Sequence, residues 1–222
     1  MSNTTETYRA RLQDEERARD YASRFEHGPR RRIDQREQRA VKRIFSELAD
    51  CRTVLDVPCG AGRFLPNLVG NQRDVIEMDQ AAEVLEFARQ RAAKSGLRAR
   101  FLEGDAGRTG LPDGSVDAVF CNRLLHHITS APERAAFLLE FHRVTRRYLV
   151  VTFFDYRSFG GLRVFLKRLK GRKPDYAGQP TLAEFQEEVV RCGFALREIV
   201  RTGPFWVSEK YFVLEKASPG GR

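Results

Sequence analysis

The sequence has few cysteines, no long apolar run and no apolar segment at its start. Its four cysteines are scattered along the chain, without the paired spacing of a zinc site, which predicts reduced thiols and no bound metal. No stretch approaches the ~18 uninterrupted apolar residues that a membrane-spanning helix requires. The polar, arginine-rich start lacks the hydrophobic core of a secretory signal. These absences predict a cytoplasmic protein.

The chain is hydrophobic enough to fold around a core. Its 222 residues are 41% hydrophobic and 10% aromatic, which excludes a wholly disordered chain and suits about one domain. The net charge is +9, and it is concentrated in one segment. Residues 143–173 hold ten basic residues against one acid, whereas residues 1–50 hold twelve basic residues against ten acids. We therefore expect attraction to an anionic partner to be local.

Strand and helix patterns alternate from residue 53 onward. Apolar runs separated by helical patterns predict strands at 53–57, 75–79, 98–105, 116–122 and 147–154. The last run is continuously apolar, as in parallel strands that are buried on both faces. Residues 194–205 and 208–217 predict two final strands, joined closely enough to pair antiparallel. This order predicts an α/β fold with a parallel sheet and helices on both faces.

Three helix starts carry the pattern of a capping box, in which a short polar residue is followed by Glu three positions later. The pairs are Asp34–Glu37, Ser130–Glu133 and Thr181–Glu184. The first pair predicts that a helix begins near residue 34, with Val41, Ile44 and Phe45 on its apolar stripe.

Four polar residues end four successive predicted strands. They are Asp56, Asp79, Asp105 and Asn122. In an open α/β sheet, ligands bind beyond the carboxyl ends of the strands. A single Asp in such a place is usually a turn or cap residue, but four in register predict a binding site.

The turn after the first strand contains Gly60 and Gly62, which let backbone approach a ligand and expose the N-terminus of the next helix. Asp79 suits the two hydroxyls of a ribose, because a carboxylate accepts both. Asp105 suits an exocyclic amine such as that of adenine. A dinucleotide fingerprint needs a third small residue, where this chain has Leu65. A cofactor with ammonium, carboxylate and adenosyl parts therefore fits better.

The segments VLDVPCGAGRFLP, VIEMDQAAEVLEFARQ and FLEGDAGRTGLPDGSVDAVFCNRLLHHI resemble the successive motifs of class I S-adenosylmethionine-dependent methyltransferases. The resemblance covers roughly residues 50–155 and implies a Rossmann-like seven-stranded sheet with an antiparallel last strand. It implies S-adenosylmethionine as the cofactor. The residues that would bind it are Asp56, Pro58, Cys59, Gly60, Gly62, Asp79, Gln80, Asp105, Ala106 and Asn122.

Position by position, the resemblance implies that the turn holds the methionine part and Asp79 the ribose. Asp105 and Ala106 would face the adenine, and Asn122 would lie along the sulfonium side. The family's first turn glycine is replaced by Pro58, which lacks an N–H to donate to the cofactor. We expect an altered turn and a working site, because Gly60 and Gly62 remain.

The N-terminal residues 1–49 are expected to form a helical lid, with Tyr21 folding over the cofactor or lying on a solvated helix. Residues 50–222 would form the methyltransferase domain, interrupted by a basic cap at about 156–178. In that cap, an apolar helical stripe with bases on its other faces suits three roles. They are contact with an anionic membrane through 157–173, a solvated cap over the pocket, or contact with an RNA backbone.

His127 is the candidate catalytic residue, because it follows the fourth strand where an acceptor would approach. The alternative is that it shapes the pocket wall. Cys59 and Cys121 suit packing better than nucleophilic chemistry. We therefore expect a methyltransferase acting on oxygen in a small or lipid-linked acceptor. The alternatives are an RNA methyltransferase, although nucleic acid is the less favoured partner, and a non-catalytic subunit that binds S-adenosylmethionine.

Overall fold

The computed structural model describes residues 19–20, 23–25, 28–154, 179–204, 207 and 209–217. Within them, seven strands form one sheet in the order β3-β2-β1-β4-β5-β7-β6. The strands are β1 Thr53–Asp56, β2 Asp74–Asp79, β3 Arg100–Glu103, β4 Val116–Cys121, β5 Thr145–Phe154, β6 Phe194–Arg201 and β7 Glu209–Lys216. The first five are parallel, and β7 pairs antiparallel with both β5 and β6. The predicted fold class is confirmed, including the antiparallel end of the sheet.

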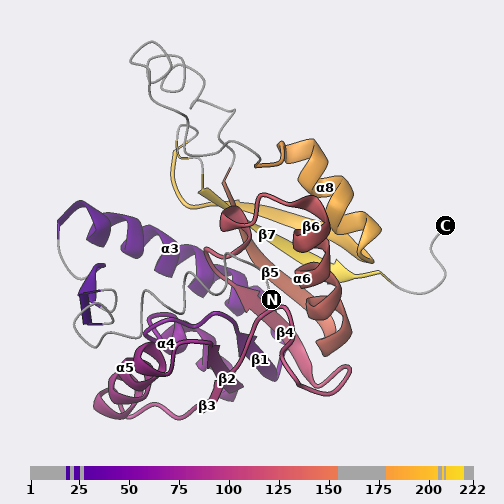
Figure 1. The fold of residues 1–222 in the computed structure, drawn as a ribbon. Coiled ribbons are helices and arrows are strands. Elements are labelled where there is room, and N and C mark those ends of the chain that lie inside the picture. The colour runs from indigo at the N-terminus through magenta and orange to yellow at the C-terminus, as the bar shows by residue number, and fades with distance from the viewer. Residues whose placement is uncertain are drawn as a thin grey trace.

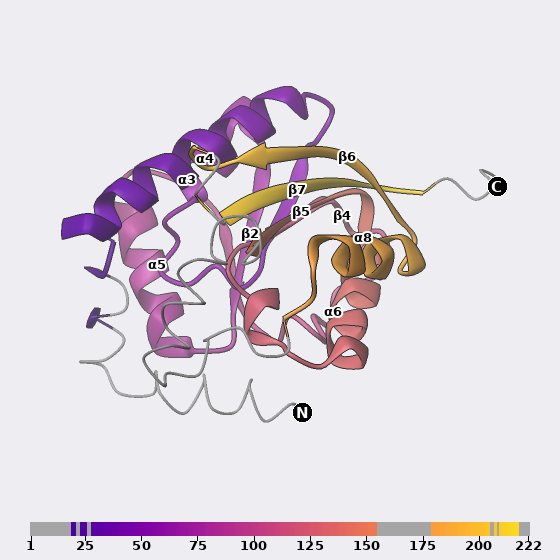
Figure 2. The ribbon, with the colours of Figure 1, turned by 90° about the horizontal axis from the view of Figure 1, so that it is seen from above.

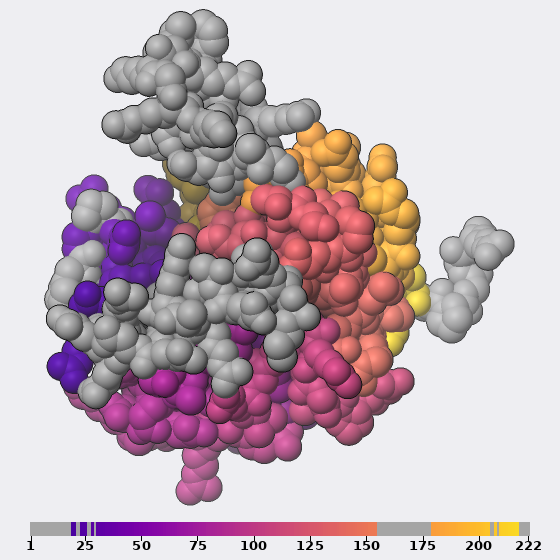
Figure 3. All heavy atoms as spheres, viewed as in Figure 1, coloured from indigo at the N-terminus to yellow at the C-terminus, as the bar shows by residue number. Residues whose placement is uncertain are grey.

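The described helices lie on both faces of this sheet (Figures 1 and 2). The helices are α3 Gly28–Glu47, α4 Leu65–Leu68, α5 Ala82–Lys94, α6 Ala131–Val144 and α8 Leu182–Arg191. Figure 2 shows α3, α4 and α5 on one side of the strands, and α6 and α8 on the other. In the space-filling view, the magenta first half forms the bottom of the molecule and orange α8 lies at its upper right (Figure 3).

Each face of the sheet has its own hydrophobic cluster. One cluster joins α6 and α8 to the sheet through residues such as Phe141, Phe185 and Leu149. The other contains Val41 and Ile44 of α3, together with strand residues of the opposite face. Helix α3 is therefore packed into the main core of the molecule. The alternation of clusters along β5 explains why its sequence is continuously apolar.

The helix start predicted near residue 34 is wrong. Helix α3 begins at Gly28, so Asp34 and Glu37 lie inside it and cannot cap its N-terminus. Their carboxylates instead pair with Arg63, which directly follows the glycine turn after β1. Ser130 precedes α6 but makes no side-chain cap bond, whereas the box of Thr181 and Glu184 at α8 is confirmed.

Several sequence-based expectations fall outside the described residues. These are Tyr21 and the basic segment 155–178, which includes the proposed membrane-contact residues 157–173. Three bases at the start of the predicted basic window are described: Arg143, Arg146 and Arg147. Each pairs with a carboxylate, and among their partners are Asp113, Asp117 and Glu215. No helix among the described residues is long and apolar enough to cross a bilayer.

Candidate functional site

The ends of the central parallel strands bring the predicted residues to one edge of the sheet. Asp56 at the end of β1 is in register with Glu77 of β2 and Phe120 of β4. Asp79 ends β2 opposite Glu103 of β3. Because these strands are parallel, their carboxyl ends form a common edge with the loops that follow. The predicted grouping of Asp56, Asp79 and the loops after β3 and β4 is therefore present.

The glycine turn after β1 folds back against β2. Gly60 and Gly62 have φ values of 55° and 66°, a region that side-chain-bearing residues rarely adopt. A Cβ at Gly62 would lie 3.1 Å from the Cβ of Ala88 in α5, so the turn packs closely against that helix. The N–H of Cys59 donates to the Met78 carbonyl at 2.8 Å. Pro58, preceded by a cis peptide bond, leaves the rest of the turn intact.

The Asp79 side chain holds this turn in place. Its Oδ2 accepts from the Gly60 N–H at 2.9 Å, and its Oδ1 accepts from the Ala81 N–H at 3.0 Å. The residue is 0% exposed, and burial raises its pKa to about 6 despite these hydrogen bonds. A carboxylate offers about four lone-pair sites, so Asp79 can fix the turn and still accept from a ligand hydroxyl.

A cluster of three buried carboxyl groups lies beneath the turn: Asp56, Glu77 and Asp79. Neither oxygen of Asp56 has a hydrogen-bond partner within the described part of the chain, and the Cys59 thiol interacts with the Glu77 carboxyl. Burial raises the pKa of Asp56 well above its usual value, and raises that of Glu77 to about 8. Sequence reasoning missed Glu77, although a Glu inside an apolar strand is a signal in itself.

Such a cluster favours a positively charged group, because unpaired buried carboxyls are costly. Arg63 lowers the pKa of Asp56, but its guanidinium group pairs with Asp34 and Glu37. The described residues contain no group of three or more His, Cys, Asp or Glu side chains arranged to hold a metal ion. A positively charged group of a ligand, such as an ammonium or sulfonium group, would suit these buried carboxyls.

The loop after β3 places Asp105 and Ala106 at the same edge. Oδ1 of Asp105 accepts from the Gly107 N–H at 2.7 Å, which closes a tight turn and leaves Oδ2 for another donor. Ala106 is 8% exposed, and half-buried Gln80 follows directly after Asp79. These positions are compatible with the predicted contacts to an adenine ring, which remain a prediction.

The end of β4 is fixed by side chains from two other strands. Asn122 is buried, and its Oδ1 accepts from the Tyr211 hydroxyl of β7 at 3.0 Å. The next residue, Arg123, has a φ of 59°, and its N–H donates to Thr152 Oγ1 at 2.7 Å. The Asn122 oxygen is therefore occupied, so its amide N–H₂ is the group that remains to face a ligand.

Glu37 of α3 joins the two loops that border the site. Its Oε2 lies 2.5 Å from Nη2 of Arg63, which directly follows the glycine turn, and its Oε1 lies 2.7 Å from Nε of Arg123. Asp34 pairs with Arg63 at 2.6 Å, and Glu209 pairs with Arg123 at 3.0 Å. We call Glu37, Arg63, Arg123 and Glu209 the clamp.

The charges within the clamp are closely coupled. Glu37 is 0% exposed. Its burial favours a higher pKa, but Arg63 and Arg123 together with a hydrogen bond to Glu209 bring the value below its usual range. Burial and the neighbouring Glu37 raise the pKa of Glu209 to about 9. Glu37 therefore ionises at a lower pH than Glu209, because it lies between both arginines.

The clamp was missed at the level of sequence, although signals for it are present. Arg63 and Arg123 each stand next to a predicted site residue, which calls for a buried acidic partner. Glu37 lies four and seven residues before Val41 and Ile44, on the apolar stripe of its helix. An acid on such a stripe predicts a buried ion pair.

Residues 23–25 lie over the clamp. The Phe25 ring is 4.3 Å from the Arg63 guanidinium carbon and 5.5 Å from that of Arg123. Arg24 lies close enough to the histidine pair after β4 to lower both pKa values. The described part of the N-terminal segment therefore covers the site loops, although Tyr21 lies outside it.

The two histidines of the turn Leu125–His127 contact each other with their ring planes tilted by 41°. Their ring centroids are 3.9 Å apart, and His126 lies 4.5 Å from Phe154 at the end of β5. Burial, helped by neighbouring positive charges, lowers the pKa of His126 to about 3 and also lowers that of His127. His127 is the exposed member of the pair. It is therefore a neutral imidazole at pH 7, in contact with solvent.

The site thiols are poorly suited to nucleophilic chemistry. Cys59 and Cys121 are 5% and 0% exposed. Burial and nearby carboxyl groups raise both pKa values well above the usual thiol range, so the reactive thiolate is scarce. This agrees with the prediction that both residues serve in packing.

Part of the chain is similar to known methyltransferases. Residues 54–147 match a family model described as a methyltransferase domain. Demethylmenaquinone methyltransferase of Deinococcus radiodurans is 43% identical over 72 residues, or 32% of this chain and 30% of that protein. Malonyl-[acyl-carrier protein] O-methyltransferase of Pectobacterium atrosepticum is 35% identical over 100 residues, or 45% and 37%. The chain thus spans about a third of the length of these curated relatives.

The fold is similar to solved methyltransferase structures. Magnesium protoporphyrin IX methyltransferase from Synechocystis PCC 6803 with bound SAH superposes with a TM-score of 0.75 at 18% identity, covering 97% of this chain and 100% of that one. A SAM-dependent methyltransferase from Methanosarcina mazei gives 0.64 at 21% identity, covering 78% and 96%. At these identities the likeness shows the fold.

Proposed function

We propose that this chain, whose residues 54–147 match a methyltransferase domain, is a class I S-adenosylmethionine-dependent methyltransferase that transfers a methyl group to an oxygen of a small or lipid-linked acceptor. The observation that carries the proposal is the glycine turn closed over three buried carboxyl groups at the ligand edge of the sheet. The name of one matched relative, malonyl-[acyl-carrier protein] O-methyltransferase, supports an oxygen as the methylated atom, and that of another, demethylmenaquinone methyltransferase, supports a lipid-like acceptor.

The residues present suit the proposed cofactor. S-adenosylmethionine supplies an electrophilic methyl group on a positively charged sulfur. Asp56 offers buried carboxyl oxygens without hydrogen bonds from described residues, and Glu77 lies beside it in the sheet, which favours the cofactor's cationic groups nearby. Asp79 has lone pairs for the ribose hydroxyls, Gln80 lies beside it, and the Asp105–Ala106 loop would face the adenine. The roles of Pro58, Cys59, Gly60, Gly62 and Asn122 in binding are part of the same proposal.

The chain's own contribution to the reaction is to orient the acceptor and receive a proton. We assign His127 as the group that accepts the proton of an acceptor hydroxyl, because its lowered pKa keeps it neutral at pH 7. His126 contacts it and holds the ring in place. Residues 23–25 lie over the clamp, which suits a lid that limits access of water to the site.

Replacing His127 with alanine tests this role. We expect His127→Ala to lower kcat about 100-fold, the usual scale for a lost general base, while the affinity for S-adenosylhomocysteine stays within about twofold. The matched control is His142→Ala, because His142 lies in α6 against Phe194, away from the site loops. Full activity of the His127 variant would make this residue part of the pocket wall.

Cofactor binding should release protons. A cationic ligand stabilises the ionised form of nearby carboxyls, whose pKa values are raised to about 6 at Asp79 and about 8 at Glu77. Since binding favours deprotonation, affinity should rise with pH between about 6 and 8 and then level off. Calorimetry of S-adenosylmethionine binding at pH 7, in buffers of different ionisation enthalpy, measures the released protons. Proton uptake, or affinity that falls with pH, would contradict this.

Incubation with tritium-labelled S-adenosylmethionine and fractionated cell extract tests the whole proposal. We expect label in a small or lipid-extractable fraction, in a base-labile ester or an ether, and no label with the Asp79→Ala variant. Label in RNA would replace this acceptor class with nucleic acid. Bound cofactor without label in any fraction would support a non-catalytic subunit.

A further inference from the structure

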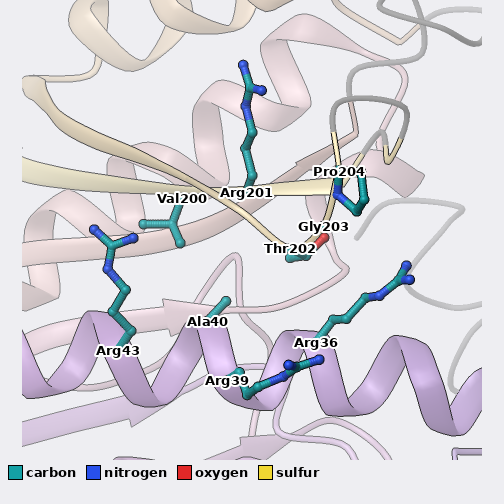
Figure 4. A pocket seen from close by; sticks show the side chains of 9 residues that line it. All are labelled: Arg36, Arg39, Ala40, Arg43, Val200, Arg201, Thr202, Gly203 and Pro204. Carbon is teal, nitrogen blue, oxygen red and sulfur yellow. The ribbon is translucent and has the colours of Figure 1, made fainter.

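A groove lined by arginines lies between α3 and the chain that follows β6. Its volume is about 390 Å³. It is lined by Arg36, Arg39, Ala40, Arg43, Val200, Arg201, Thr202, Gly203 and Pro204. Figure 4 shows Arg36 and Arg43 extending upward from α3 and Arg39 lying along the helix, while the Arg201 side chain extends away from that helix. Ala40, Val200 and Pro204 give the groove a partly apolar lining.

The clamp explains why this face of α3 is positive. Of the three acids in α3, Asp34 and Glu37 turn inward to Arg63, and Glu47 pairs with Arg43. Within the described ranges, neither Arg36 nor Arg39 forms an ion pair with a carboxylate. The balanced charge count of residues 1–50 therefore conceals a one-sided surface, which the sequence analysis did not anticipate.

The described arginines of the predicted basic window differ from Arg36 and Arg39 in their surroundings. Arg143, Arg146 and Arg147 lie near the start of β5, and each has a carboxylate within ion-pair distance. Arg36 and Arg39 beside the groove differ from these three, because no carboxylate pairs with them within the described ranges.

The groove opens at the same edge of the sheet as the cofactor site. Strand β6 runs in the same direction as β5, because both are antiparallel to β7. Arg201 at the end of β6 is opposite Lys210, which is in turn opposite Phe153 of β5. With neighbouring strands about 4.8 Å apart, the end of β6 is about 10 Å from the end of β5, where Phe154 contacts His126.

We propose that this groove docks an acidic protein surface, with carboxylates of the partner paired to Arg36 and Arg39 and an apolar side chain against Val200 and Pro204. The planar guanidinium group pairs with carboxylates in a two-pronged geometry. Arg36 and Arg39 are three residues apart on α3. Two acidic residues one turn apart on a partner helix have the same spacing, so each carboxylate would face one arginine.

One observation favours a protein over RNA. Beside the arginines, the lining contains the apolar side chains of Ala40, Val200 and Pro204, which suit an apolar side chain of a protein partner better than a phosphate backbone. The docking is independent of the proposed reaction, because its test needs neither cofactor nor turnover.

A synthetic helical peptide tests the proposal. It carries Glu on one helical face, at intervals of three and seven positions, with Leu beside them. A second peptide carries Lys in place of each Glu. We expect the full-length protein to bind the Glu peptide and not the Lys peptide in a fluorescence-anisotropy titration, with affinity that falls as salt is added. The double variant Arg36→Glu/Arg39→Glu should weaken binding about tenfold or more, as two lost ion pairs imply, and should gain affinity for the Lys peptide.

The matched control is Arg98→Glu/Arg100→Glu, which changes the net charge equally at exposed positions beside β3. If the first double variant fails to fold by circular dichroism, Arg36→Gln/Arg39→Gln replaces it. The proposal is overturned if the Glu peptide does not bind, if both double variants weaken it equally, or if single-stranded poly(U) RNA binds the groove and displaces the peptide.

Discussion

Replacing Asp79 with alanine should weaken the binding of S-adenosylhomocysteine about 100-fold or more. The variant loses a carboxylate that accepts from two backbone N–H groups and, under the proposed function, from the ribose as well. Hydrogen bonds to a charged group contribute roughly 1.5–3 kcal/mol each, so loss of the two proposed bonds from the ribose hydroxyls accounts for this effect. The dissociation constant is measured by calorimetry at pH 8, where Asp79 is ionised.

Asp74→Ala is the matched control, because Asp74 is an exposed Asp at the start of the same strand. We expect it to bind the cofactor product as the native chain does. The Asp79 variant should remain folded, because removal of a costly buried charge offsets part of the lost hydrogen bonding. Unchanged affinity in a folded Asp79→Ala protein would contradict the assignment of this residue to the ribose.

Replacing Glu37 with glutamine should destabilise the fold and loosen both site loops. The substitution keeps the shape of the side chain but leaves Arg63 and Arg123 without the anion between them. Removal of one partner from a buried ion pair costs about 3–5 kcal/mol, which predicts a melting temperature lower by about 10 °C for a chain of this size. We also expect weaker cofactor binding, because Arg63 directly follows the glycine turn.

Glu47→Gln provides the comparison within the same helix. Glu47 forms an exposed pair with Arg43 at 3.0 Å, and such pairs contribute little to stability. Its melting temperature should stay close to that of the native chain. Equal shifts for the two variants, or a Glu37 variant with native stability and native cofactor affinity, would show that the clamp does not position the loops.

Much of the fold follows from residue patterns that act locally. The apolar runs at 53–57 and 147–154 needed only their own composition and neighbouring turns to be read as buried strands. The Thr181–Glu184 box was also correct, because both partners of a capping box lie within one turn of helix. Features that depend on nearby residues were therefore accessible from the sequence.

Features that depend on distant residues were not. Asp34 and Glu37 have the spacing of a capping box, but Arg63 and Arg123 compete for the same carboxylates from 29 and 86 residues away. Local spacing carries no information about such partners, so the helix start was misplaced. The same tertiary pairing removes the acids from the surface of α3, which makes the arginine groove visible only in the structure.

The candidate site was predicted only in outline, because its hydrogen bonds also join residues that are far apart in the sequence. The polar residues at the strand ends were found, since the parallel order of the strands alone brings them together. Their bonding was not found: Asp79 is linked to Gly60, and Asn122 to Tyr211. Glu77 was overlooked because a single acid in an apolar strand gains meaning only beside Asp56 and Asp79.

A calorimetric titration of the native chain with S-adenosylhomocysteine, run beside an identical titration with NADH, addresses the central claim most directly. We predict one saturable site per chain for the adenosyl compound and no saturable heat for the dinucleotide. Binding of NADH alone, or of neither compound to folded protein, would contradict the claim that these strand ends enclose a methyl donor.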